Sequence, residues 1–376
     1  MVNEKGLIKD HKGVGRLASL DIMRGLIMIL LCAESCLLYQ RLKNISSVSA
    51  LAKIVDQFFH HPWHGLHFWD LVQPAFMFIA GVAMYISYNG KKSKGQHWQQ
   101  NLGHILIRSL KLFICGLALH CVYAGKPVFE LWNVLTQLAF TTILAYMIID
   151  QSNRWQLLCS IALILLTEVL YRTVSPPGFD QPFEPGKNFG AYLDQVLMGK
   201  INSDGWVAFN AVPTAAHTIW GVLIGRLLMT EKTKRSKMFI MLLAGAIALL
   251  IGFGLDLAGI TPIIKRISTS SFVFASAGWV LWMMAGLYWL TDIKQYNRYA
   301  WVCTVVGMNS IFIYLFFETV GMQWLNGTVA IFTGDMLHLL VHLPLSIAAL
   351  ISAIVALLLQ WGLCYWLFKR KIFFKL

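Results

Sequence analysis

Charged residues are scarce in this sequence, and so are the cysteine patterns of disulfide or metal sites. Asp, Glu, Lys and Arg make up 13% of the 376 residues and 57% are hydrophobic, whereas soluble proteins carry roughly 25% charged residues. The seven cysteines all fall in apolar stretches and include no CxxC pair, which favours small core residues over a disulfide framework or a thiolate metal site. The composition therefore predicts an integral membrane protein.

The sequence also lacks a stretch that resembles a cleaved signal peptide. Its first apolar run follows a polar, basic arm, residues 1–16, with no small-residue cleavage site after it. We find no separate soluble domain and no convincing internal repeat. We therefore expect residues 1–376 to form a single integral-membrane domain, in which 1–16 is a cytoplasmic arm and 173–212 is the largest external loop.

Ten stretches are long and apolar enough to cross a bilayer, since about 20 helical residues span ~30 Å of hydrocarbon. The sequence thus predicts an all-α, polytopic membrane protein with about ten transmembrane helices. The expected spans are 20–39, 66–88, 105–124, 129–149, 155–172, 213–229, 238–256, 272–291, 300–319 and 344–368.

The distribution of Lys and Arg predicts the orientation. An even number of spans places both termini on one side, where the terminal segments and loops carry 18 Lys and Arg, against 8 in the loops of the opposite side. Short loops rich in these residues stay in the cytoplasm, so we expect both termini to be cytoplasmic. The net charge of +13 then reflects topology and contact with anionic membrane lipid, and we expect no nucleic-acid partner.

A histidine-rich segment precedes the second span. Four histidines lie within residues 60–67, just before Asp70, which is about one helical turn inside the span. The segment is consistent with an interfacial belt of aromatic and histidine residues. It is also consistent with a zinc site of His60, His64 and His67, although a proline interrupts the helix that would align them. A third reading is a general base, because a histidine oriented by a buried carboxylate is the usual form of such a base.

Polar residues inside other spans are further candidates, because they are costly in a membrane and usually functional. Asp21 and Arg24 share a face of the first span at i, i+3, which fits either an internal ion pair or an anion held at a helix N-terminus. Asn309 and Ser310, midway into the ninth span, fit either donors to a developing oxyanion or hydrogen bonds between helices.

Several residues on the expected outer side are candidates for binding an acceptor. Lys265 lies there against the charge trend and either binds an acceptor or extends along the membrane surface. Glu318 ends the ninth span near the same face, where it fits contact with an amino group or an exposed helix end. Trp63 and His64, in the same segment as His60, complete the acceptor-binding candidates, and we assign no residue to a metal.

Five stretches follow one another along the chain: RLASLDIMRG at 16–25, HHPWHGLHFWDLVQPAFMFIAG at 60–81, WNVLTQLAF at 132–140, GMNSIFIY at 307–314 and the terminal KRKIFFKL. In this order they resemble the heparan-alpha-glucosaminide N-acetyltransferase family and its bacterial relatives. The resemblance extends over essentially all ten spans, and its most specific parts are H-x-x-W-x-G-x-x-x-x-D-L-V-x-P and G-M-N-S-I.

The resemblance implies a transmembrane acetyltransferase that uses acetyl-CoA as donor and the amine of a glucosamine-type sugar as acceptor. The family's catalytic histidine, the first of the H-x-x-W block, is His60 here. We expect His60 to deprotonate the acceptor while Asp70 fixes the imidazole tautomer. Direct transfer and an acetyl-histidine intermediate both remain open.

The two substrates are expected to arrive from opposite sides. Acetyl-CoA is too polar to cross the membrane and its phosphates need cations, so we expect its nucleotide at the cytoplasmic face near Asp21 and Arg24. We expect its thioester to reach Asn309 and Ser310 through a protein-lined tunnel. The acceptor amine would come from the other side, near His60.

The chain departs from the resembled family at several points. Ser35 stands where the family often has asparagine, Thr136 and Gln137 stand where animal members have Gln-Arg, and the large luminal domain of the animal enzyme is absent. The resemblance and the lack of a targeting segment favour a multi-pass protein of a bacterial inner membrane. We also include a homodimer among the candidate partners. Two other functions stay open: a secondary transporter of an amino sugar, and an O-acyltransferase acting on a cell-envelope glycan or lipid.

Overall fold

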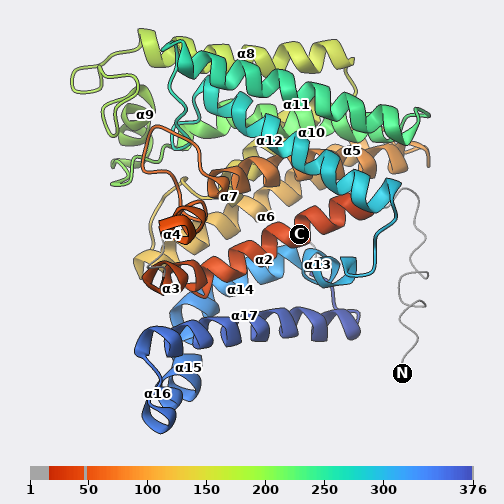
Figure 1. Cartoon of the computed structure of the whole chain (residues 1–376). Helices are drawn as coiled ribbons and strands as arrows, with labels where there is room; N and C mark the ends of the chain where they lie inside the picture. Colours follow the sequence, from red (N-terminus) through yellow and green to blue (C-terminus); the bar gives the residue numbers. More distant parts are fainter. Residues whose placement is uncertain (1–16, 46–48, 375–376) are drawn as a thin grey trace.

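The regular structure is helical throughout the part of the chain that the computed structural model describes, residues 17–45 and 49–374. The predicted all-α fold is therefore confirmed for these residues, and the expected basic arm, 1–16, lies outside them. Most helices run side by side in one bundle (Figure 1). The first half contains α2 (Ala18–Ser35), α3 (Leu38–Ile45), α4 (Ser49–Asp56), η2 (Phe68–Leu71), α5 (Val72–Lys92), α6 (Trp98–Ala124), α7 (Val134–Met147) and α8 (Asn153–Thr173).

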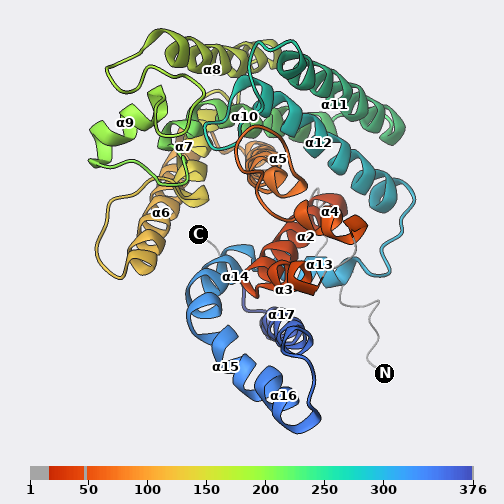
Figure 2. The same cartoon turned by 60° about the vertical axis from the view of Figure 1, so that its left-hand side comes forward.

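The second half of the chain adds helices to both sides of this bundle, including stretches of π-helix that continue an α-helix. In Figure 2, α13, α14 and α17 gather around α2, whereas α8, α10, α11 and α12 lie on the side of α5. These elements are α9 (Phe189–Met198), η3 (Ala208–Asn210), α10 (Ala211–Leu228), α11 (Lys234–Leu257), α12 (Ser270–Tyr288), η4 (Trp289–Ile293), α13 (Ala300–Gly307), α14 (Ser310–Phe316), η5 (Phe317–Leu325), α15 (Asn326–Ala330), η6 (Ile331–Asp335), α16 (Met336–Val341) and α17 (Leu345–Lys369).

The described helices are those of a polytopic membrane protein. Seven are long and apolar enough to cross a membrane, and the number rises to nine if each of two bent helix pairs counts as one span. The span expected at 129–149 is shorter than predicted, because α7 has only 14 residues. An extended segment that contains Trp132 and Asn133 precedes it, and the Asn133 side chain caps the helix by accepting a hydrogen bond from the Leu135 amide at 2.7 Å.

Two expected spans, 20–39 and 300–319, are broken rather than continuous. The first bends by 63° between α2 and α3, and the second bends by 72° between α13 and α14. At the first break Leu37 has a φ of 60°, a left-handed conformation that an α-helix does not contain. The carbonyl of Ser35 accepts a hydrogen bond from Asn326 at 2.6 Å. A carbonyl group at the end of α2, which has no partner within the helix, is therefore satisfied by a side chain from a distant element.

Close backbone contact between α5 and α10 forms the centre of the bundle. A Cβ atom added to Gly81 would lie 2.0 Å from the Thr218 carbonyl oxygen, and one added to Gly221 would lie 2.2 Å from the Phe78 carbonyl oxygen. Small residues that allow such an approach are typical of packing between membrane helices. Buried apolar side chains of α2 and α12 then pack against α5, so the helix that follows Asp70 is held on several sides.

At one end of the bundle, the histidine-rich loop before α5 is joined to the loop between α11 and α12. The Gly65 amide donates a hydrogen bond to the Ile263 carbonyl at 2.9 Å, and His64 and Ile264 form an isolated antiparallel bridge. The His64 Nε2 atom lies 2.7 Å from Asp256 Oδ1. These contacts bring a segment more than 190 residues distant in sequence beside the candidate catalytic residues.

Candidate active site

Asp70 is fixed by the backbone that surrounds it. It lies in the short helix η2, and its Oδ2 atom accepts hydrogen bonds from the backbone amides of His67 at 2.9 Å and His61 at 3.2 Å. The side chain is fully buried, and a buried carboxylate needs such donors. Because the loop amides occupy Oδ2, the other carboxylate oxygen is left to a different partner.

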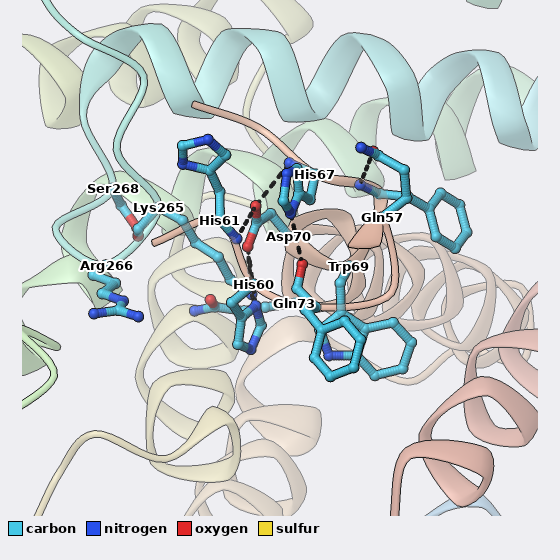
Figure 3. A network of polar contacts seen from close by, with 12 residues as sticks. Gln57, His60, His61, His67, Trp69, Asp70, Gln73, Lys265, Arg266 and Ser268 are labelled. Carbon is cyan, nitrogen blue, oxygen red and sulfur yellow. Dashed lines mark hydrogen bonds and ion pairs between the residues drawn. The ribbon is translucent and has the colours of Figure 1, made fainter. Parts of the chain in front are cut away.

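That partner is His60. Its Nδ1 atom lies 2.9 Å from Asp70 Oδ1 (Figure 3). A neutral imidazole that donates its Nδ1 hydrogen to Asp70 carries a free lone pair on Nε2. The side chain of His60 is 36% exposed, so Nε2 can meet a substrate. The structure thus brings the two predicted catalytic residues into the geometry of an oriented general base.

Lys265 completes this cluster from the loop between α11 and α12. Its Nζ atom lies 3.0 Å from His60 Nδ1 and 3.6 Å from Asp70 Oδ1, and its side chain is almost wholly buried. The ammonium group also lies 5.3 Å from the ring centroid of Trp206, which stands edge-on to His60. When Nδ1 donates its hydrogen to Asp70, Lys265 acts on the imidazole as a charge rather than as a hydrogen-bond donor.

The electrostatics of this cluster keep His60 neutral. Burial, and then the charge of Lys265, lower the pKa of His60 to about 4, against the opposing effect of Asp70. Burial also lowers the pKa of Lys265 to about 8, although Asp70 and Glu34 favour its charged form. Near neutral pH His60 is therefore a neutral proton acceptor, and Lys265 is mostly an ammonium ion.

Two other histidines of the loop have different partners. His64 contacts Asp256, and His67 Nδ1 lies 3.0 Å from the Phe59 carbonyl oxygen. Within the described residues there is no group of three or more His, Cys, Asp or Glu side chains that could hold a metal ion. The described residues therefore give no geometric support to a zinc site of His60, His64 and His67. An interfacial belt of aromatic and histidine residues does not explain why His60 is paired with Asp70.

Two predicted acceptor-binding residues hold the loop in place. Trp63 Nε1 donates a hydrogen bond to the Phe183 carbonyl at 2.8 Å, and His64 bonds to Asp256. Neither residue lines the cavity into which His60 faces. Their roles in acceptor binding stay predictions. The contacts seen in the structure show that both residues stabilise the loop.

His60 opens into a cavity of about 150 Å³, the His60 cavity. Lys265 and Glu318, both predicted to contact the acceptor, line it together with Glu34. The carboxylate of Glu34 accepts a hydrogen bond from Trp69 Nε1 at 2.9 Å, and that of Glu318 accepts one from Tyr123 at 2.6 Å. The cavity therefore brings together an imidazole, a cation and two oriented carboxylates within one small volume.

A second cavity, of about 410 Å³, is lined by Arg24, Arg108 and Ser310, and we call it the arginine cavity. Arg24 Nη1 lies 3.8 Å from Asp21 Oδ1, so the predicted ion pair is present but long. Arg108 comes from α6, and its guanidinium group interacts electrostatically with that of Arg24. Two neighbouring guanidinium groups repel one another, and an anion placed between them would relieve that repulsion.

Asn309 lies at the break between α13 and α14 and is fully buried. Its Nδ2 atom donates to the Ile372 carbonyl at 3.1 Å, and its Oδ1 atom accepts from the Phe374 amide at 3.0 Å. Phe374 and Ser310 both line the arginine cavity. Asn309 thus anchors the segment after α17 against this cavity, and a contact with a thioester stays a prediction for both Asn309 and Ser310.

The His60 cavity and the arginine cavity adjoin. Phe76, Val134 and Tyr314 line both of them, so these three side chains form the boundary between His60 and the two arginines. A single elongated molecule could reach from one cavity to the other past this boundary. The protein-lined passage expected from the sequence stays a prediction, for which these two adjoining cavities supply a location.

Sequence reasoning missed Arg108 and the contact of Lys265 with His60. An arginine inside the expected span 105–124 is itself a signal, because charged residues at such depth are rarely without function. The proximity of Lys265 to His60 carried no comparable signal, since the two residues are 205 positions apart.

A comparison with protein families gives one match. Residues 16–257 match the family described as heparan-alpha-glucosaminide N-acetyltransferase, catalytic. The matched region includes His60 and Asp70 and ends before Lys265 and Ser310. A comparison with curated proteins gives no match.

Proposed function

Because the chain belongs to the heparan-alpha-glucosaminide N-acetyltransferase family of transmembrane acetyltransferases, we propose that it uses acetyl-CoA from the cytoplasm. The acetyl group would pass to the amine of a glucosamine-type sugar on the opposite side of the membrane. The observation that carries this proposal is the pair of adjoining cavities, one with two arginines and the other with His60. Each substrate then has its own chamber, and the reaction takes place where the chambers meet.

The donor would occupy the arginine cavity. Arg24 and Arg108 supply positive charge for the phosphates of acetyl-CoA, and Ser310 adds a hydroxyl in the same wall. The acetyl thioester would then point past Phe76 and Tyr314 toward His60. Protein side chains form the walls of both cavities, and a polar molecule within a bilayer needs such walls.

His60 would act as the general base. Its Nε2 atom accepts a proton from the acceptor amine as the nitrogen attacks the thioester carbonyl carbon, and Asp70 stabilises the imidazolium that forms. A carbon–nitrogen bond forms and the carbon–sulfur bond breaks. The proton on His60 then passes to the departing thiolate, so that CoA leaves with a neutral thiol group. An acetyl-histidine intermediate is the alternative route.

Measured acetyl transfer by the detergent-purified protein tests this assignment. His60→Ala should reduce CoA release from acetyl-CoA and glucosamine by at least about a hundredfold, the usual contribution of a general base. Asp70→Asn should cost a comparable or smaller factor. His61→Ala is the matched control, because it removes a histidine side chain of the same loop and keeps the backbone amide that donates to Asp70. A near-normal rate for His60→Ala would refute the catalytic assignment.

We place the protein in a bacterial inner membrane, with both termini and the loop 89–104 in the cytoplasm. A single cysteine introduced into 89–104 should then react with an impermeant thiol reagent only after the cells are permeabilised. Labelling of that site in intact cells would contradict the two-sided reaction.

One observation favours a transporter instead. Two spans are discontinuous, and broken helices often form the substrate sites of secondary transporters. A transporter would bind an amino sugar without consuming a thioester. Saturable binding of acetyl-CoA to the purified protein, followed by loss of the thioester when glucosamine is added, supports the enzyme, and its absence supports the transporter.

A further inference from the structure

A third cavity adjoins the His60 cavity and has no part in the proposed reaction. Its volume is about 450 Å³, within the roughly 300–1,000 Å³ typical of ligand sites. It lies between α6, α7, α9 and the start of α10, and we call it the side cavity. Its wall is mainly hydrophobic and includes Leu110, Phe113, Phe140, Ile143, Leu193 and Leu197.

The side cavity borders the surface that faces lipid. Four of its wall residues are large and exposed: Leu106 (44%), Leu110 (58%), Phe140 (42%) and Leu197 (54%). They lie on α6, α7 and α9, and the first two belong to a helix long and apolar enough to cross a membrane. Hydrocarbon surrounds such a surface in a bilayer, so the natural occupant of the cavity is a hydrocarbon chain.

The wall between the side cavity and the His60 cavity is thin. Gln137 lines both cavities, and Leu131 lines the side cavity while its neighbour Trp132 lines the His60 cavity. The same alternation occurs in a second segment, where Ala208 lines the side cavity and Trp206 lines the His60 cavity. The polar His60 cavity and the apolar side cavity therefore adjoin along two stretches of chain.

The junction also carries hydrogen-bonding groups. The amide of Gln73 donates to the amide oxygen of Gln137, and Thr136 belongs to the wall of the side cavity beside Gln137. An amphiphile has the complementary pattern, a polar headgroup joined to a hydrocarbon tail. A soluble sugar would use the His60 cavity alone and leave the side cavity without a purpose in catalysis.

We propose that the acceptor is a lipid-linked amino sugar, whose hydrocarbon chain occupies the side cavity while its amine reaches His60. This inference rests on the proposed acetyl transfer and narrows its substrate class. The chain would be held by the apolar wall between α6 and α7, and the linkage to the sugar would pass beside Gln137. The reaction itself is unchanged, because the chain contributes binding and not chemistry.

Two acceptors of matched chemistry test the inference. The probes are free glucosamine and an octyl glucosaminide, each with acetyl-CoA in the same detergent, and the measured quantity is the ratio of their kcat/KM values. The octyl compound should be the better acceptor. Leu110→Trp narrows the side cavity from an exposed position and should lower the ratio about tenfold, the loss of roughly two buried methylenes at about 0.8 kcal/mol each.

Ile107→Trp is the matched control, because Ile107 is 56% exposed on the same helix and does not line the side cavity. Its ratio should equal that of the wild type. Ala139→Leu fills the side cavity from its buried wall and gives a second test should Leu110→Trp not fold. In both filling variants, kcat/KM for free glucosamine should be unchanged.

The possible outcomes separate this inference from the proposed function. If free glucosamine is acetylated and the octyl chain brings no advantage, or if the filling variants leave the ratio unchanged, the side cavity holds only structural lipid and the inference is overturned. If neither compound is acetylated, the proposed function fails and the inference fails with it. A preference for the octyl compound that only the filling variants remove supports the inference.

Discussion

Replacement of Lys265 by methionine should change the pH dependence of acetyl transfer. The ammonium group lies 3.0 Å from His60 Nδ1 and lowers the pKa of the imidazole. Methionine keeps an unbranched, apolar side chain of similar length but removes the charge. Without that charge the pKa of His60 rises, and the histidine becomes protonated, and thus unable to accept a proton, at a higher pH.

The size of the change follows from Coulomb's law. Two unit charges about 4 Å apart interact by about 1 kcal/mol in bulk water and by about 4 kcal/mol near a protein surface. The His60 side chain is 36% exposed, so solvent screening places the effect near the lower figure. Since 1.36 kcal/mol corresponds to one pKa unit, the pKa of His60 should rise by about one unit from its present value of about 4.

The assay is the dependence of kcat/KM on pH between about 3 and 8, which reports groups of both the free enzyme and the free acceptor. The acceptor amine titrates alike for every variant, so only the acidic limb that belongs to the enzyme can differ between variants. In Lys265→Met this limb should move to higher pH by about one unit. In Lys265→Arg, which keeps the charge, it should stay near its wild-type position. A purely structural role would lower the rate at every pH without moving the limb, so an unmoved limb in Lys265→Met would refute the electrostatic reasoning.

Three further substitutions test other parts of the structure. Arg108→Ala should weaken acetyl-CoA binding about tenfold or more, because a hydrogen bond to a charged group contributes about 1.5–3 kcal/mol. Calorimetric titration measures the affinity, and the control is Lys111→Ala, which changes an exposed residue of the same helix. Phe76→Trp should slow acetyl transfer more than it weakens acetyl-CoA binding, because a larger ring narrows the boundary between the two cavities. Binding and turnover are measured on the same sample. Gly81→Val should prevent recovery of a monodisperse protein by gel filtration, whereas Gly90→Ala, with open space around it, should behave as the wild type.

The pairing of His60 with Asp70 could be predicted because the information is local. The two residues are ten positions apart, and the intervening turn brings a carboxylate at the start of a helix back toward the loop that precedes it. The helical character of the chain could be predicted for a similar reason, since long apolar stretches leave few alternatives in a membrane. Both features depend on residues that are close together in the sequence and on the apolar interior of the membrane.

The position of Lys265 could not be predicted in the same way. The sequence marked it as a lysine on the outer side, and nothing in the local pattern connects it to a histidine 205 residues earlier. The connection depends on Gly65, His64 and Asp256, which join the two loops. Such contacts are tertiary, and the local sequence pattern does not reveal which distant loops will meet.

The breaks in the first and ninth spans were not predicted, because neither contains a proline. The residues at the first break, Cys36 and Leu37, are apolar and give no turn signal. Elsewhere in a bilayer an interrupted helix would leave backbone groups unsatisfied. Here Asn326 bonds to the end of α2, and Asn309 bonds to the segment that follows α17, so the determinants of both breaks are distant side chains or distant backbone.

The location of the two breaks connects the fold to the proposed reaction. Irregular backbone within a membrane is stable only where protein or a cavity surrounds it. The first break follows Glu34, which lines the His60 cavity, and the second lies between Gly307 and Ser310, which line the arginine cavity. Each interruption therefore opens space in the bundle for one end of the passage. A continuous helix at either position would carry its side chains across that space, and the base and the arginines would no longer face adjoining cavities.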